Sequence, residues 1–160
     1  MIRKAKIDDV PEIQKLINAH ADRGELLHRS LNEIYESMRD YFVLDEDGLI
    51  VGCCALHVSW ADLAEAKSLV VDDDLQGHGH GKALLESCLN EARELGISRV
   101  FALTYKPAFF KKYGFRTLPK SELPHKVWSE CIRCAKFPDC GEEALMVELM
   151  VPLGELTDDE

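Results

Sequence analysis

One stretch of the chain decides the fold: Val70-Val71-Asp72-Asp73-Asp74-Leu75-Gln76-Gly77-His78-Gly79-His80-Gly81-Lys82-Ala83. It joins an apolar, β-rich run (residues 64–71) to an amphipathic run (residues 83–95) through a polar loop dense in glycine. Gly77, Gly79 and Gly81 let the backbone approach a ligand closely and turn its amides inward. The helix that follows adds the positive end of its dipole. This strand–loop–helix unit predicts a cradle for a pyrophosphate group.

The spacing of the glycines separates the known kinds of phosphate loop. The dinucleotide fingerprint needs G-x-G-x-x-G, whereas the chain has G-x-G-x-G. The P-loop needs glycine where Gln76 stands, and serine or threonine where Ala83 stands. Both nucleotide motifs therefore fail. A flexible loop that only caps a helix stays open as an alternative, although three alternating glycines cost backbone entropy that a plain turn does not lose.

A third pattern does match. Gln76-x-x-Gly79-x-Gly81 resembles the Q/R-x-x-G-x-G/A pyrophosphate loop of the GNAT acetyltransferases, which bind acetyl-coenzyme A. Further along, Phe109-Phe110-Lys111-Lys112-Tyr113-Gly114-Phe115 resembles that family's aromatic-x-x-x-G-F signature, on the helix beside the coenzyme thiol. The resemblance implies an α/β fold of the GNAT type, with a mixed, mostly antiparallel central sheet flanked by helices. It also implies acetyl-CoA as co-substrate, and no metal required for catalysis.

A narrower resemblance concerns the acetyltransferase domain of bacterial N-acetylglutamate synthases. It rests on residues 24–30, 52–56, 64–65 and 98–104, and it covers residues 1–118 well. The chain looks like a short, stand-alone form without the kinase-like domain, so arginine feedback through that domain does not carry over. This resemblance implies acetylation of the α-amine of L-glutamate in arginine biosynthesis. Another small amine, a protein N-terminus, or a non-catalytic acyl-CoA-binding or metal-sensing module are the alternatives.

Composition and charge limit the classes of protein to which the chain can belong. The 160 residues are 46% hydrophobic and 30% charged, which is ordinary globular usage. A formal charge of −10 with no basic stripe argues against nucleic-acid binding. No apolar run is long enough to span a membrane, and no signal peptide is visible at the start, so we expect a cytoplasmic protein. We expect one domain over residues 1–155 and a frayed acidic tail over 156–160. Acetyl-CoA and a small amino acid are the expected partners; the oligomeric state stays open, with a homodimer as one alternative.

Periodicity predicts the order β-α-α-β-β-β-α-β-α-β-β. Asp8-Asp9-Val10-Pro11 is a helix start, and Ser30-Leu31-Asn32-Glu33 fits a capping box. Asp45-Glu46-Asp47-Gly48 is a hairpin signal. The predicted strands cover residues 2–7, 41–44, 49–58, 64–71, 99–104, 115–118 and 144–151, and the remaining helices cover 83–95 and 107–114.

Acetyl transfer to an amine requires a base and a group that polarises the thioester carbonyl. We assign the base to Glu65, which opens the strand leading to the loop, and the resemblance implies the same role. A surface carboxylate with no catalytic role is the alternative. Polarisation is expected from backbone amides of Leu69, Val70 or Val71, because a locally splayed strand leaves an amide free to donate.

The departing thiolate can also take a proton. Many relatives use a tyrosine where this chain has Phe110, which has no hydroxyl. The glutamate-synthase resemblance moves this hydroxyl to the end of the preceding strand, at Thr104. Tyr105 and Tyr113 are rival candidates, and the absence of any essential donor is the remaining alternative.

An amino-acid acceptor carries carboxylates, so an acidic protein must supply local positive charge. Arg29 stands just before the capped helix and can grip a carboxylate with two hydrogen bonds. The resemblance also implies a substrate arginine there; a solvated surface arginine is the alternative. Lys67 and Arg133 are weaker candidates. We expect the coenzyme to contact Leu69, Val70, Val71, Gln76, Gly77, His78, Gly79, His80, Gly81, Lys82 and Phe110.

The six cysteines fall into two groups. Cys53, Cys54 and Cys88 stand in apolar stretches and are expected to be small buried hydrophobes. The other three, with one histidine, could form a structural zinc site, a redox disulfide, or unmetallated residues of a substrate-side loop. These metal candidates are His125, Cys131, Cys134 and Cys140.

Overall fold

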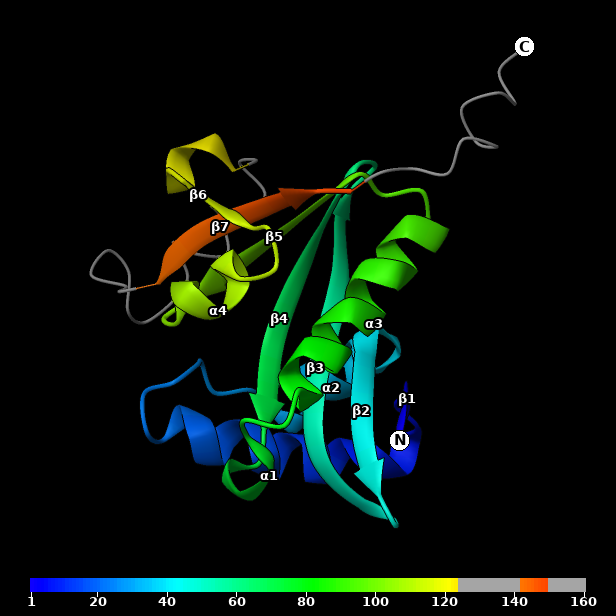
Figure 1. Ribbon diagram of the computed structural model, residues 1–160. Coiled ribbons are helices and arrows are strands. Elements are labelled where there is room, and N and C mark those ends of the chain that lie inside the picture. The colour runs from blue at the N-terminus through cyan, green and yellow to red at the C-terminus, as the bar shows by residue number, and fades with distance from the viewer. Residues whose placement is uncertain (124–141, 150–160) are drawn as a thin grey trace.

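The computed structural model of the protein describes residues 1–123 and 142–149. Seven strands form one sheet in the order β1-β2-β3-β4-β5-β7-β6, and every neighbouring pair is antiparallel except β4 with β5 (Figure 1). The strands are β1 (Ile2–Lys4), β2 (Tyr41–Glu46), β3 (Leu49–Trp60), β4 (Leu63–Val71), β5 (Arg99–Thr104), β6 (Arg116–Leu118) and β7 (Glu143–Glu148). The helices are α1 (Val10–Ala21), α2 (Leu31–Glu36), α3 (His80–Glu94) and α4 (Pro107–Lys111). This order and the mixed sheet confirm the predicted fold class.

Local signals set most element boundaries. The Ser30 hydroxyl accepts the Glu33 amide at 3.1 Å, and the Glu33 carboxylate accepts the Ser30 amide at 3.1 Å, so the predicted capping box starts α2. In the β2–β3 hairpin, the Asp45 carboxylate accepts the Gly48 amide at 2.7 Å, and Gly48 has a φ of +90°. Both turns therefore follow from side-chain chemistry that is local in sequence.

The first strand is shorter than predicted. It ends at Lys4 instead of residue 7, because the chain turns into a short 3₁₀ helix, Ile7–Asp9. The Asp9 carboxylate holds this turn by accepting the Lys6 amide at 2.7 Å. The same carboxylate accepts two hydrogen bonds from Arg3, at 2.7 and 3.1 Å. Apolar alternation predicted the longer strand, and this partly buried ion pair accompanies its early end.

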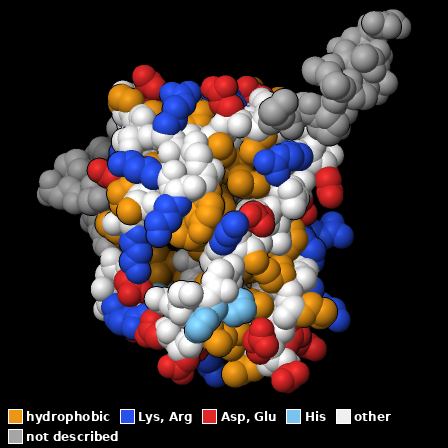
Figure 2. All heavy atoms as spheres, viewed as in Figure 1, with side chains coloured by type: hydrophobic (Ala, Val, Ile, Leu, Met, Phe, Trp, Pro, Cys, Tyr) orange, Lys and Arg blue, Asp and Glu red, His pale blue; other side chains and the backbone are white. Residues whose placement is uncertain are grey.

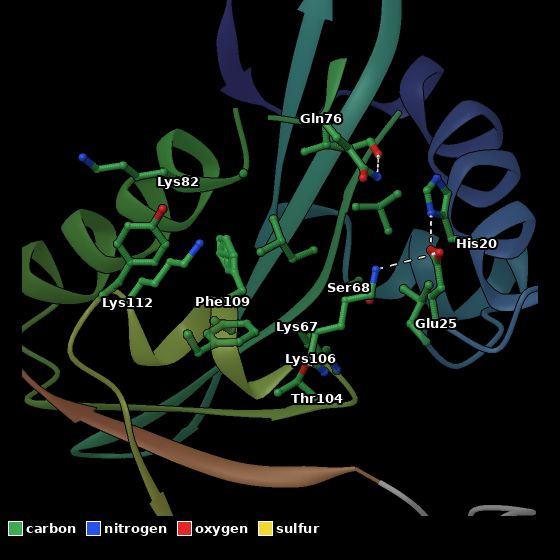
Figure 3. Close-up of a pocket in the computed structure, with 18 of the residues that line it drawn as sticks. His20, Glu25, Lys67, Ser68, Gln76, Lys82, Thr104, Lys106, Phe109 and Lys112 are labelled. Carbon is green, nitrogen blue, oxygen red and sulfur yellow. Dashed lines mark hydrogen bonds and ion pairs between the residues drawn. The ribbon is translucent and has the colours of Figure 1, made fainter. Parts of the chain in front are cut away.

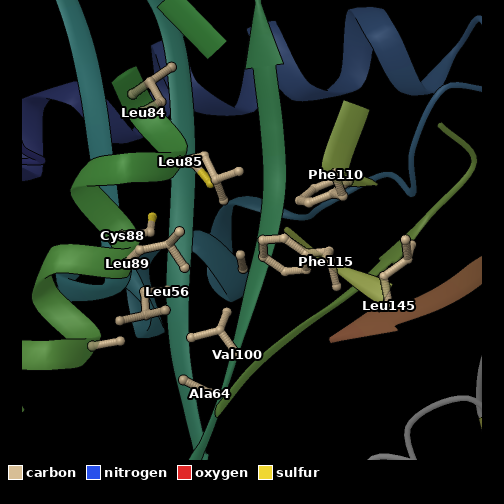
Figure 4. Close-up of a cluster of buried hydrophobic side chains, with 14 of the residues drawn as sticks. Leu56, Ala64, Leu84, Leu85, Cys88, Leu89, Val100, Phe110, Phe115 and Leu145 are labelled. Atoms are coloured by element: carbon tan, nitrogen blue, oxygen red, sulfur yellow. The ribbon is translucent and has the colours of Figure 1, made fainter. Parts of the chain in front are cut away.

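Helices cover both faces of the sheet. The apolar stripe of α3 packs on one face, where Leu84, Leu85 and Cys88 meet side chains from β3, β4 and β5 (Figure 4). The helices α1 and α2 lie on the other face, where Ile13, Ile17 and Ile34 pack over β2, β3 and β4. Cys53 and Cys54 are also buried, which confirms the reading of these two and Cys88 as core residues. Within residues 1–123 and 142–149, no helix is long and apolar enough to cross a membrane.

An extra residue in β4 shifts by one position which side chains face α3. Ala64 and Ala66 face the α3 cluster, but so do Leu69 and Val71. The pairing with β3 jumps from Ala55↔Lys67 to Cys53↔Val70, so the strand carries a β-bulge at residues 68–69. Ser68 within it has a φ of +56°, a conformation that is strained for a residue with a side chain.

The bulge precedes a gap in the sheet. β4 and β5 are paired only from Leu63↔Arg99 to Glu65↔Phe101. Beyond that point the two strands diverge, as Figure 1 shows, while β5 stays paired with β7 as far as Thr104. The splay that the sequence analysis required is therefore present, and it begins one residue after Glu65.

We predict that Asp9→Asn lowers the free energy of unfolding by about 2–3 kcal/mol at neutral pH, since it breaks a mostly buried, charge-assisted pair. Hydrogen bonds from Arg3 hold the pKa of Asp9 below its usual range. The pair's contribution is therefore complete above the unfolded-state pKa of ~3.9 and is lost as pH falls through the lower folded-state pKa. Denaturant unfolding of both proteins across pH measures this.

Asp62→Asn is the matched control, because the Asp62–Arg99 pair at 2.9 Å is half exposed. It should change stability by less than about 1 kcal/mol. Equal losses in the two variants, or an Asp9 effect that persists unchanged below pH 3, would contradict the prediction.

Candidate active site

The diverging strands border a cavity of about 390 Å³. Its wall combines the end of α1, the second half of β4, the glycine loop with the start of α3, the end of β5, and α4 (Figure 3). This volume suits a small-molecule ligand. The strand, glycine loop and aromatic helix singled out in the sequence therefore line one cavity.

The glycine loop has the backbone expected of an anion cradle. Gly77 and Gly79 have φ values of +83° and +85°, and a Cβ at either position would meet no atom within 4 Å. Gly79 is the N-cap of α3, and neither an acidic side chain in the first turn nor a side-chain cap covers the amides there. The start of α3 therefore presents free amides and a positive dipole end to the cavity.

Gln76, predicted to contact the coenzyme, shapes the loop instead of only lining it. Its side-chain amide donates to the Val71 carbonyl at 3.0 Å and to Asp73 at 3.3 Å. These bonds fold the loop back onto the end of β4. His78 and His80 are not among the residues that line the cavity, whereas Gly77, Gly79, Gly81 and Lys82 are.

Charge is concentrated in the cavity with the opposite sign to that of the whole chain. Lys67, Lys82, Lys106 and Lys112 line it, against Glu25 and Glu142. Figure 2 shows Lys and Arg side chains gathered around a hollow with a hydrophobic floor. The cavity thus offers cations to an anionic ligand, although the protein as a whole carries −10.

Aromatic rings of α4 and of the turn after it form one wall. Phe110, the predicted contact, is 6% exposed and packs edge-on against Phe115 in the core. Phe109 and Tyr113 also line the cavity, with ring centroids 5.0 Å apart. A Cβ at Gly81 would lie 3.5 Å from the Phe109 ring, so the glycine lets this ring approach the loop closely.

Glu65 lies at the point where the sheet opens. Its side chain is 8% exposed, and it alternates with Ala64 and Ala66, which face α3. It therefore points to the face that carries α1 and α2. Glu65 is the last β4 residue paired with β5, one position before the lining residue Ala66, but it is not itself a lining residue. Its role as the base stays a prediction.

The candidate proton donors differ in position. Thr104 lines the cavity at the end of β5, and its hydroxyl oxygen accepts the Lys106 amide at 2.9 Å. That hydroxyl therefore keeps its own proton to donate. Tyr113 lines the cavity from the turn after α4, whereas Tyr105 is not a lining residue.

Arg29 lies beside the cavity instead of in its wall. Its guanidinium is 3.5 Å from Glu33, and its Nε is buried. Burial raises the pKa of Tyr41 to about 12, and the nearby Ser68 hydroxyl and Arg29 guanidinium oppose that rise. Arg29 Nε and Ser68 Oγ are the two buried side-chain polar atoms, among the described residues, without a well-formed hydrogen bond. A buried donor without a partner is uncommon in folded proteins.

The far end of the cavity holds a group that the sequence analysis missed. The Glu25 carboxylate lies 2.7 Å from His20 Nδ1, 3.4 Å from Arg23 and 3.8 Å from Lys106. Arg23 also binds Asp73 at 2.6 and 3.1 Å, and so links the end of α1 to the loop after β4.

Some of these residues left a signal in the sequence and some did not. His20 continues the buried face of α1 set by Ile13 and Ile17, so a polar residue there was detectable. Lys112 lies within the aromatic motif that was already identified, and Lys106 stands three residues before it. Glu25 belongs to residues 24–30, which carry the narrower resemblance, but its place in the cavity depends on the folded α1–α2 connection.

No group of three or more His, Cys, Asp and Glu within residues 1–123 and 142–149 could hold a metal. The metal candidates His125, Cys131, Cys134 and Cys140 lie outside the described residues, as does the substrate candidate Arg133.

Comparisons of the sequence with a family model and with curated relatives assign the chain to a family. Residues 37–117, just over half of the chain, match the model of the acetyltransferase (GNAT) domain. An uncharacterized N-acetyltransferase of Chlorobaculum tepidum is 35% identical over 92% of this chain and 96% of its own length. An amino-acid acetyltransferase of Mycobacterium tuberculosis is 36% identical over 83% of this chain and 78% of its own.

A solved structure agrees with the sequence matches. The N-acetylglutamate synthase of Neisseria gonorrhoeae, crystallised with coenzyme A and N-acetyl-glutamate, superposes with a TM-score of 0.83 at 32% identity. The superposition covers 94% of this chain and 35% of that one, so the likeness concerns one part of the larger enzyme. The glycine loop, the splayed strands and these matches lead to one conclusion: the chain belongs to the GNAT family of acetyltransferases.

Proposed function

We propose that this protein transfers the acetyl group of acetyl-CoA to the α-amino group of an amino acid, and that the amino acid is L-glutamate. The observation that carries the proposal is a single cavity in which a glycine-rich helix start and a set of lysines meet at a gap between two strands. The relatives named above add support, because one is an amino-acid acetyltransferase and another was crystallised with coenzyme A and N-acetyl-glutamate. Such a reaction belongs to arginine biosynthesis, which is expected in the cytoplasm.

The coenzyme would occupy the end of the cavity near α3 and α4. The uncapped amides at the start of α3 and the Lys82 and Lys112 side chains suit a pyrophosphate, and Lys82 forms an exposed pair with Glu86 at 3.8 Å. The rings of Phe109 and Tyr113 suit the apolar pantetheine arm. We propose no metal for this chemistry, because hydrogen bonds and proton transfer meet each of its needs.

The acceptor would enter from the face that carries α1 and α2. Lys67 lines the cavity there, and the unpartnered Arg29 Nε lies nearby. Glu65 would take the ammonium proton, directly or through water. Backbone amides of residues 69–71 would polarise the thioester carbonyl, and Thr104 would donate to the departing sulfur. The buried, half-paired setting of β4 favours this division of roles, because electrostatic effects are stronger out of water.

The test is a thiol-release assay with acetyl-CoA and a panel of acceptors: L-glutamate, L-glutamine, L-alanine, a polyamine and an N-terminal peptide. We expect glutamate to give the highest kcat/KM. A neutral amino acid, the polyamine or the peptide as best acceptor would refute the glutamate assignment, and no turnover with any amine would refute the proposed activity.

Arg29→Ala should raise the KM for glutamate by about tenfold to a hundredfold, which corresponds to about 1.5–3 kcal/mol for a charged hydrogen-bonded pair. The KM for acetyl-CoA should stay the same. Arg39→Ala is the control, because it removes the same positive charge from a residue that does not line the cavity. A glutamate KM that is unchanged by Arg29→Ala would remove Arg29 from the acceptor site.

Gly79→Ala should weaken acetyl-CoA binding at least tenfold, because a φ of +85° disfavours a side chain and the new methyl group faces the anion cradle. Gly48→Ala is the matched control: its φ is +90°, its Cβ would also meet no atom, and it lies in a distant hairpin. Titration calorimetry with CoA should separate the two. Equal coenzyme affinity in both variants, with both folded, would exclude the loop as the binding site.

Glu65→Gln should lower kcat by about 10²–10⁴-fold, as expected for removal of a general base, with little change in coenzyme affinity. The loss should shrink as pH rises, because a larger fraction of the acceptor amine is then already deprotonated. A variant within threefold of the parent rate at every pH would show that another group takes the proton.

A further inference from the structure

The cavity contains a carboxylate that belongs to the protein itself. Glu25 lines the end away from Lys82 and Lys112, on the connection between α1 and α2 (Figure 3). Three cationic or protonatable groups surround it: His20 Nδ1 at 2.7 Å, Arg23 at 3.4 Å and Lys106 at 3.8 Å. Together these three groups could bind a carboxylate, and the protein's own Glu25 already occupies that position.

The ionisation state of this carboxyl group is set by its neighbours. Partial burial alone would raise the pKa of Glu25, but the hydrogen bond to His20 and the charges of Lys106 and Arg23 hold the pKa below its usual range. Glu25 is therefore an anion at neutral pH, placed where a second anion from the ligand would be repelled.

The three contacts are unequal in strength. His20 is 8% exposed in its side chain and its contact is short, and Arg23 is anchored independently by Asp73. Lys106 is the weak member, because its ammonium is 3.8 Å away and its side chain is 62% exposed. Its backbone is fixed, since its amide donates to the Thr104 hydroxyl. The ammonium can therefore change partner while the rest of the cluster stays in place.

We propose that Glu25 and Lys106 set the acceptor specificity of this site: Glu25 holds Lys106 when no acceptor is bound, and the side-chain carboxylate of a dicarboxylic amino acid takes Lys106 from it. The inference rests on the proposed function. Lys106 extends from the β5–α4 connection across the open gap toward Glu25, so it stands beside any acceptor that reaches β4. An acceptor without a second carboxylate has nothing to offer Lys106 and leaves the Glu25–Lys106 pair intact.

The proposal predicts kinetic changes of opposite sign for the two partners. Glu25→Gln removes the competing carboxylate, so the KM for glutamate should fall by about three- to tenfold with kcat within twofold. Lys106→Gln should raise the KM for glutamate by about five- to twentyfold. Neither substitution should change the KM for glutamine by more than twofold, because glutamine has a neutral side chain of the same shape. Steady-state kinetics at saturating acetyl-CoA measure all four values.

A double variant separates the ion pair from a general charge effect. If Lys106 is the agent, Glu25→Gln combined with Lys106→Gln should behave like Lys106→Gln alone. A gain that persists without Lys106 would show that lost repulsion, and not release of Lys106, lowers the KM. The control is Glu91→Gln, which removes the same charge from a pair with Lys4 at 3.1 Å outside the cavity and should leave the KM for glutamate unchanged.

The outcomes also distinguish the proposal from the function on which it rests. Failure of the parent protein to acetylate glutamate would refute the proposed function. If the parent acetylates glutamate but Glu25→Gln raises the KM for every amine, Glu25 binds the acceptor ammonium instead, and the present inference is wrong. An unchanged KM for glutamate in Glu25→Gln would refute it equally.

Discussion

The site depends on the place where β4 and β5 stop pairing. Each strand keeps its other neighbour, since β4 stays bonded to β3 and β5 to β7, so the sheet opens without losing either half. The parallel ladder holds for only three residue pairs; Glu65 is in the last of them, and the β4 and β5 residues that line the cavity lie beyond it. A gap within a sheet exposes backbone amides that face one another across a cavity, which no intact ladder can offer to a ligand. The glycine loop, the lysines and the aromatic helix are arranged around that opening.

Charge in this molecule is organised locally. A chain with 29 acidic and 19 basic residues repels anions at long range, yet the cavity wall carries four lysines and two glutamates. Lys82 stands in the first turn of α3 and Lys112 at the end of α4, whereas Lys67 and Lys106 stand near the gap (Figure 3). An anionic ligand is therefore attracted only once it is close, within about a Debye length of the cavity. Binding selectivity then comes from fixed contacts and not from steering.

Sequence reasoning succeeded where the deciding contacts are close along the chain. The capping box at Ser30, the hairpin at Asp45 and the glycine loop at Gly79 are all local, and the structure has each of them. It fell short where tertiary contacts decide. Strand β1 is cut short by the Arg3–Asp9 pair, and Phe109 lines the cavity beside the predicted Phe110 although the sequence analysis did not include it among the coenzyme contacts. Glu25 lies in the stretch 24–30 that carries the narrower resemblance, but its place in the cavity was missed, because His20, Arg23 and Lys106 converge on it only after folding.

The change of phase in β4 has a consequence for how this protein can vary. Even-numbered residues face α3 before the bulge and odd-numbered residues face it afterwards. A regular strand over residues 64–71 would turn the apolar side chains of Leu69 and Val71 to the face that carries Glu65 and Lys67. Loss of Ser68 would keep these side chains on their present faces, but it would remove a residue that lines the cavity and has a positive φ. Such a deletion should therefore leave the packing against α3 intact and change the shape of the cavity wall, so the extra residue serves the site and not the core.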